Sequence, residues 1–108
     1  MKLIVQIPAV NEEETLAEAI LAIPRTIPGV SSVEVLVIDD GSTDQTVEVA
    51  RKAGASHILQ MSSHVGLARA FLAGIEHCLS LGADIIVKSE RKAVSDAFSD
   101  LRSKAKKL

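Results

Sequence analysis

VEVLVIDDGSTDQT, residues 33–46, runs from an almost continuous apolar segment into two adjacent aspartates and a turn of small polar residues. A short apolar run of this kind is typical of a parallel strand that is buried on both faces. Gly41 favours a sharp turn behind the acids, and the period of the apolar residues that follow predicts an amphipathic helix ending at Gly54. The stretch therefore predicts a strand, a turn and a helix, with Asp39 and Asp40 at the carboxyl end of the strand.

The same alternation of strand-length and helix-length segments runs through the whole chain. Apolar runs predict strands, and amphipathic periods that end in turns predict helices. The predicted strands cover residues 2–8, 33–39, 57–61 and 84–88. The predicted helices cover residues 11–23, 42–54, 66–81 and a lysine-rich stretch over 91–108.

Polar residues before two of these helices predict how the helices begin. Asn11 and Ser42 are the expected N-caps, because each is followed three residues later by a partner of the capping-box type, Glu14 or Gln45. The expected core face of the third helix consists of Leu67, Ala70, Phe71, Gly74, Ile75, Cys78 and Leu79. The last helix is expected to cover the sheet with Val94, Ala97, Phe98, Leu101 and Ala105.

Strict alternation with short connections predicts one α/β domain over residues 1–108. We expect a three-layer, Rossmann-like arrangement in which a four-stranded parallel sheet of order 3-2-1-4 carries helices on both faces. In such sheets the ligand crevice lies beyond the carboxyl ends of the strands, near the point where the strand order reverses. The segments after the first two strands, residues 8–14 and 39–45, therefore form the expected binding edge.

Composition excludes several function classes. The chain has 108 residues, a formal net charge of −2, two Phe and no Trp or Tyr. Without a basic surface or aromatic platforms, nucleic acid is not an expected partner. No apolar run approaches the length of a membrane span. A single cysteine, Cys78, excludes an internal disulfide and suits a reducing, cytoplasmic setting. Its neighbour His77 points in another direction on the helix, which argues against a catalytic Cys-His pair.

Three segments carry a resemblance to a known family. They are IPAVNEEETL at residues 7–16, VLVIDDGSTDQTVEVA at residues 35–50 and HVGLARAFLAGIEHCLSLGADIIV at residues 64–87. Together they resemble the nucleotide-binding half of family 2 glycosyltransferases of the GT-A fold, the group that includes dolichyl-phosphate mannose synthases. The resemblance covers residues 3–87, and residues 88–108 diverge from it.

The resemblance implies a site for a nucleotide or nucleotide sugar of the UDP or GDP type. The implied nucleotide-binding residues are Pro8, Val10, Glu12, Val37, Asp39, Asp40, Gly66 and Arg69. Glu12 would lie near the ribose hydroxyls and Asp39 would accept a hydrogen bond from the base, while Gly66 and Arg69 would lie toward the phosphates. Carboxylates are good acceptors for such hydroxyl and ring N–H donors. A dinucleotide site is not expected, because no Gly-x-Gly-x-x-Gly follows the first strand.

The chain departs from the family pattern in two places. The family usually has tyrosine where Val10 stands, so an aromatic contact to the nucleoside is missing. After the fourth strand the family carries an Asp-x-Asp motif that holds Mg²⁺ or Mn²⁺, whereas this chain has Glu90, Arg91 and Lys92. An ammonium group repels a divalent cation, so we expect no metal requirement in the chain as given, although a complete family member would use Mg or Mn. We also expect a truncated, split or engineered portion that needs an acceptor-binding partner for catalysis.

Each candidate residue also has a structural interpretation. Glu12 and its acidic neighbours suit the positive end of a helix, and Asp40 suits a turn tied down through backbone N–H groups. Arg69 and Lys92 suit solvated surface positions. Three functions remain open at this point: the nucleotide-binding part of a glycosyltransferase, a nucleotide-binding module without turnover, and a non-catalytic or engineered α/β scaffold with relic motifs.

Overall fold

The structure, a computed structural model, describes residues 1–89. Its elements are β1 (Lys2–Ala9), α1 (Leu16–Leu21), β2 (Ser32–Asp39), α2 (Thr46–Ala53), β3 (His57–Gln60), α3 (Leu67–Ser80) and β4 (Ile85–Lys88). The strands form one parallel sheet in the order β3-β2-β1-β4, which confirms the predicted order. The expected helix over 91–108, with Val94, Ala97, Phe98, Leu101 and Ala105, lies outside the described residues, as do Glu90, Arg91 and Lys92.

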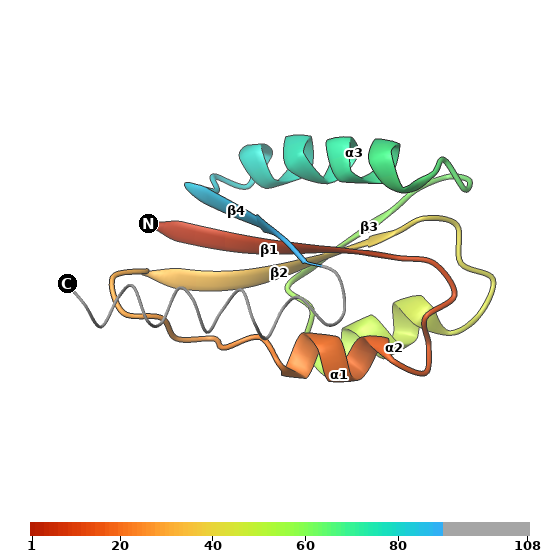
Figure 1. Ribbon diagram of the computed structural model, residues 1–108, viewed down its shortest axis with the longest axis horizontal. Coiled ribbons are helices and arrows are strands. Elements are labelled where there is room, and N and C mark those ends of the chain that lie inside the picture. Colours follow the sequence, from red (N-terminus) through yellow and green to blue (C-terminus); the bar gives the residue numbers. More distant parts are fainter. Residues whose placement is uncertain (90–108) are drawn as a thin grey trace.

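The helices cover both faces of the sheet, as expected for an α/β domain. Figure 1 shows α1 and α2 below the sheet and α3 above it. The central strands β1 and β2 pair along their whole length, from Lys2 opposite Ser32 to Ala9 opposite Asp39. Both strands therefore end at the same level, and the loops that follow them leave the sheet side by side.

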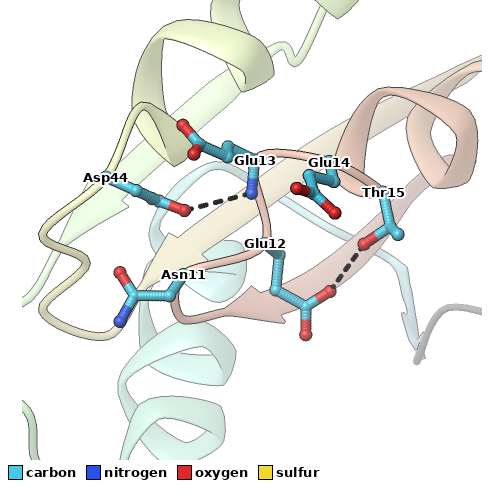
Figure 2. Close-up of a pocket in the computed structure, with 6 residues that line it drawn as sticks. All are labelled: Asn11, Glu12, Glu13, Glu14, Thr15 and Asp44. Carbon is cyan, nitrogen blue, oxygen red and sulfur yellow. Dashed lines mark hydrogen bonds between the residues drawn. The ribbon is translucent and has the colours of Figure 1, made fainter.

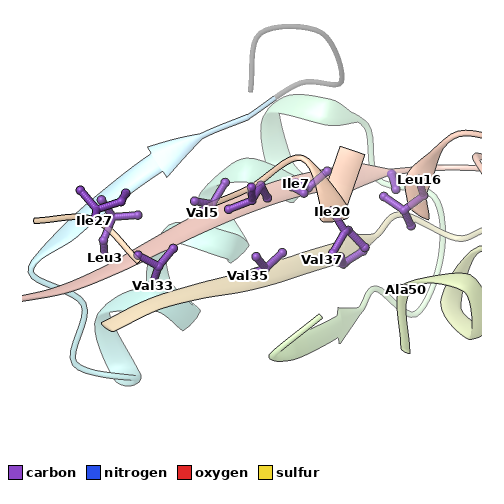
Figure 3. Close-up of a cluster of buried hydrophobic side chains, with 12 residues drawn as sticks. Leu3, Val5, Ile7, Leu16, Ile20, Ile27, Val33, Val35, Val37 and Ala50 are labelled. Atoms are coloured by element: carbon purple, nitrogen blue, oxygen red, sulfur yellow. The ribbon is translucent and has the colours of Figure 1, made fainter. Parts of the chain in front are cut away.

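The larger core lies between the sheet and α1 and α2 (Figure 3). Alternate residues of β1 and β2 point to this face, because successive side chains of a strand point to opposite sides. The buried residues that fill this core are Leu3, Val5, Ile7, Ala9, Leu16, Ile20, Ile23, Ile27, Val33, Val35, Val37 and Ala50. The remaining alternate positions, among them Ile4, Leu36 and Ile38, pack on the opposite face with Ala70 and Cys78 of α3.

Helix α3 approaches the sheet closely because Gly74 faces it. A Cβ atom at Gly74 would overlap with the side chains of Gln6 and Ile38. The buried residues of α3 are Ala70, Phe71, Gly74 and Cys78. The wider core face expected from the sequence is wrong at Leu67, Ile75 and Leu79, which are exposed. One helix on a sheet has room to bury only a narrow stripe, and nothing among the described residues covers these three side chains.

The predicted helix starts are also wrong, because both proposed caps have other partners. Helix α1 begins only at Leu16 and α2 at Thr46, and neither has a side-chain hydrogen bond at its N-cap residue. The Asn11 and Ser42 side chains instead hydrogen-bond across the two loops that follow β1 and β2. A contact between the two loops thus replaces the local capping contact that the sequence pattern predicts.

Candidate functional site

Two loops at the carboxyl edge of the sheet are joined by reciprocal hydrogen bonds. The Asn11 N–H donates to Ser42 Oγ at 2.9 Å, and the Thr43 N–H donates to Asn11 Oδ1 at 2.8 Å. Asn11 adopts a φ of 51°, a left-handed conformation that asparagine tolerates better than most residues. The loop after β1 and the loop after β2 therefore form one connected structure.

Thr46, the first residue of α2, extends this connection into the core. It is fully buried, and its Oγ1 accepts a hydrogen bond of 2.9 Å from the Glu12 N–H. Its own N–H and hydroxyl both donate to Asp44 Oδ1. The hydroxyl contact is the main cause that lowers the pKa of Asp44 below its ordinary value of 3.8.

An acidic pocket of about 310 Å³ lies beside these loops. It is lined by Asn11, Glu12, Glu13, Glu14, Thr15 and Asp44 (Figure 2). Within it the Glu13 N–H donates to Asp44 Oδ2 at 3.3 Å, and the Thr15 hydroxyl donates to Glu12 Oε2 at 3.2 Å. Four carboxylates around one pocket favour hydroxyl and N–H donors and repel phosphate groups.

Asp39 and Asp40 are both buried and belong to opposite faces of the sheet. Asp39 follows Val35 and Val37 in the alternation of β2 and so lies on the side of the sheet that α1 and α2 cover. Its Oδ1 accepts a hydrogen bond of 3.2 Å from the Ser42 N–H. Asp40 points to the α3 side, where its carboxylate accepts the N–H groups of Val65 at 2.8 Å and Gly66 at 3.1 Å. Each aspartate has its own donors, which is how the structure accommodates two adjacent like charges.

The comparison with known proteins agrees with this arrangement. The family model described as glycosyl transferase family 2 matches residues 4–87, which include both loops and all four strands except the start of β1 and the end of β4. The chain belongs to glycosyl transferase family 2. Its resemblance to that family, and the GT-A type of fold, are thereby confirmed.

Relatives within the family share this region at moderate identity. A polyprenol monophosphomannose synthase from Mycolicibacterium smegmatis is 33% identical over 92 residues, which span 81% of this chain and 34% of that protein. An undecaprenyl-phosphate mannosyltransferase from Micrococcus luteus is 33% identical over 83% of this chain and 37% of its own length. The chain thus spans about a third of these family 2 relatives.

Solved structures of other glycosyltransferases have the same fold. Glucosyl-3-phosphoglycerate synthase from Mycobacterium tuberculosis, in complex with Mn²⁺, UDP and glucosyl-3-phosphoglycerate, matches with a TM-score of 0.66 and 28% identity over 83% of this chain and 33% of its own. A mannosyltransferase from Pyrobaculum calidifontis, in complex with GDP-mannose and Mn²⁺, has a TM-score of 0.54 and 26% identity over 69% of this chain and 24% of its own.

The described residues of this family 2 chain do not fit a metal ion of the kind seen in those complexes. Within residues 1–89, no three His, Cys, Asp or Glu side chains are grouped so that they would hold one. Asp40 is already committed to backbone N–H groups. Glu90 and Lys92, which stand where the family carries its Asp-x-Asp motif, lie outside the described part of the chain.

The structure places the sequence-predicted residues at three depths. Val37 is fully buried in the core, whereas Pro8 is half-buried and Val10 is 39% exposed. Glu12 lines the acidic pocket, but Asp39 does not. Gly66 caps α3 with a φ of 95°, and Arg69 is exposed in the first turn of that helix.

Residues that the sequence did not single out join the loops. Thr46, Asp44 and His64 make contacts between segments that are distant in the sequence, and no local pattern identifies such partners. Cys78 is buried on the sheet side of α3, and this burial raises the pKa of its thiol. Among the described helices, none is both long and apolar enough to cross a membrane.

A second hollow of about 580 Å³ lies between α3 and β4. Its walls are mainly apolar and consist of Gln6, Ala68, Phe71, Leu72, Ile75, Ile86 and Lys88. None of the predicted nucleotide-binding residues lines it. The Lys88 ammonium lies 4.0 Å from the centre of the Phe71 ring, an arrangement that favours a cation–π contact.

Proposed function

We propose that the chain binds the nucleoside diphosphate of a UDP- or GDP-type sugar donor and acts as the nucleotide-binding part of a glycosyltransferase. One observation carries this proposal. The loops after β1 and β2 are joined into a single edge that holds Glu12 and Asp39 at the ends of adjacent strands. Membership of glycosyl transferase family 2 supports the same assignment.

The chemistry of the edge suggests how a nucleotide would lie on it. Asp39 uses Oδ1 for the Ser42 N–H, and no residue in the range 1–89 hydrogen-bonds to its Oδ2, which leaves that oxygen for a base N–H. Glu12, at the acidic pocket, suits the ribose hydroxyls. The phosphates would avoid this pocket and lie toward Gly66 and Arg69, where the exposed guanidinium of Arg69 supplies a positive charge. Pro8, Val10 and Asp40 would border or support the nucleoside.

We propose binding without efficient sugar transfer for the chain as given, in a cytoplasmic setting. It spans about a third of its relatives, and transfer needs a second substrate and a base that removes the acceptor proton. A separate acceptor-binding domain is the partner that this proposal implies. The Lys92 substitution favours one alternative, a non-catalytic scaffold that retains relic motifs, because it places a cation where the family carries a metal ligand.

Calorimetry with Asp39 variants tests the proposal. UDP or GDP should bind weakly to the wild type, and Asp39→Ala should reduce the affinity about tenfold or more, since a hydrogen bond to a charged group contributes about 1.5–3 kcal/mol. Asp39→Asn keeps an acceptor for the Ser42 N–H and separates loss of charge from loss of the turn. Glu76→Ala removes an exposed carboxylate from α3 and should leave the affinity unchanged. Absence of heat from millimolar UDP and GDP would favour the scaffold.

A further inference from the structure

We propose that Asp40, Gly41 and His64 form a clamp that positions the start of α3 at the nucleotide edge, and that His64 is a positioning residue for the phosphate side of the site. This inference rests on the proposed nucleotide-binding function and extends it to Gly41 and His64, which have had no place in that function so far. The clamp holds together two segments separated by more than twenty residues, the turn after β2 and the loop before α3.

The first part of the clamp is the Asp40 carboxylate. It is 3% exposed, and it accepts the N–H groups of Val65 and Gly66, the two residues that precede α3. These contacts fix the position of Gly66 relative to Asp40, and therefore relative to Asp39 beside it. An aspartate at this place sets the distance between the proposed base contact and the proposed phosphate side.

The second part is the His64 imidazole. Its Nδ1 lies 2.9 Å from Asp40 Oδ2 and 3.1 Å from the carbonyl oxygen of Asp40. Both oxygens are acceptors, so Nδ1 carries the hydrogen and donates it to Asp40. The His64 side chain is 65% exposed, and a side chain so exposed contributes little to the core. Its contacts instead fasten the loop from the solvent side.

The third part is the absence of a side chain at Gly41. This residue has a φ of 81°, in the left-handed region that favours glycine. A Cβ atom built there would lie 2.8 Å from the backbone nitrogen of His64, which is too close for the loop to keep its place. The turn after β2 and the loop before α3 are thus in direct backbone contact, and His64 closes this contact from outside.

A histidine at the other end of the sheet provides a matched control. His57 Nε2 lies 2.6 Å from Glu34 Oε1, so it forms the same kind of pair with a carboxylate. Glu34 lies near the amino end of β2 and His57 begins β3, so neither residue belongs to the joined loops. His57→Ala should therefore disturb a similar contact without changing the nucleotide edge.

The test combines amide hydrogen exchange with nucleotide calorimetry on the full chain. His64→Ala should accelerate exchange of the Val65 and Gly66 amides by at least about fivefold through local opening. It should weaken UDP or GDP binding by about three- to tenfold, the effect of one lost hydrogen bond. His64→Asn, whose amide can donate to the same oxygens, should recover much of both effects. His57→Ala should leave both unchanged.

The outcomes distinguish the clamp from the proposed function. If Asp39→Ala weakens nucleotide binding but His64→Ala changes neither exchange nor affinity, the clamp is wrong and the nucleotide site stands. The clamp is also wrong if His57→Ala has the same effects as His64→Ala, or if His64→Asn behaves like the alanine variant. If the wild type binds no nucleotide, the proposed function and the positioning role of His64 both fail.

Discussion

Asp39 and Asp40 divide their roles because adjacent residues of a strand point to opposite faces. Asp39 serves the turn on the α1 and α2 side, and Asp40 serves the loop before α3. Backbone N–H donors stabilise both carboxylates, so their repulsion is opposed locally. One dipeptide at the end of β2 therefore organises both sides of the proposed nucleotide site.

A third carboxylate, Glu34, lies near the amino end of β2 and makes the stability of the fold depend on pH. It lies between His57, at 2.6 Å, and Lys2, at 3.4 Å. The hydrogen bond from His57 is the main cause that lowers the pKa of Glu34 below its ordinary value of 4.5, with a smaller effect of Lys2, while burial opposes both. A lowered pKa contributes stability above pH 4.5, and this contribution is lost as the pH falls through the folded-state value.

Glu34→Gln should therefore lower the free energy of unfolding at pH 7, by less than about 1 kcal/mol because the ion pairs are partly solvated. The difference from the wild type should shrink as the pH falls below 4.5, where the wild-type carboxylate also becomes neutral. Urea titrations at several pH values between 7 and 3 measure this. A difference that stays constant over that range would show that the charge of Glu34 does not stabilise the fold.

At the scale of the elements, α3 presents neighbouring apolar residues in opposite environments. Phe71 is 8% exposed, and Leu72 is 64% exposed. Phe71→Ala should cost about 3–5 kcal/mol in the free energy of unfolding, because it empties a buried aromatic site. Leu72→Ala should change it by about 0.5 kcal/mol or less, as usual for a surface position. Denaturant titration compares the two variants, and equal losses would show that the exposed face of α3 is covered in solution.

The strands and their order were predictable from sequence, whereas the helix starts were not. Apolar runs such as residues 33–39 identify a strand wherever it lies, and strict alternation limits the topology to few choices. A cap depends on which acceptor is nearest in space. Asn11 and Ser42 have suitable groups, but the parallel pairing of β1 and β2 brings the two loops together, and these groups bond across the loops.

The candidate site was predictable to the same degree. Glu12 and Asp39 were expected at one edge of the sheet because both follow parallel strands, and the register of β1 with β2 places them there. The structural interpretation of Asp40 as an acceptor for backbone N–H groups also agrees with the structure, but its donors belong to a distant loop. His64 carried no local signal, since its partner is twenty-four residues away.

At the scale of the whole molecule, the residues available as metal ligands determine the expected response to metal ions. Solved relatives hold Mn²⁺ with a nucleotide, whereas no described grouping in this chain suits a metal, and Glu90, Arg91 and Lys92 follow β4 in the sequence. We expect Mn²⁺ to change nucleotide affinity by less than about threefold, or about 0.7 kcal/mol. Calorimetry with and without Mn²⁺ measures this. A tenfold gain in the wild type would show that the metal ligands come from elsewhere in the chain.

The most direct test is to map the nucleotide on the molecule by amide chemical shifts. On titration with UDP or GDP, the proposed site predicts shifts confined to residues 9–14, 39–46 and 64–69, the segments that meet at the carboxyl edge. No shift is expected at or near the amino ends of the strands, where Lys2, Glu34 and His57 lie. Shifts concentrated at the amino ends of the strands, or at Leu72, Ile75 and Ile86 in the hollow between α3 and β4, would contradict a nucleotide site at the joined loops. So would the absence of shifts at millimolar nucleotide.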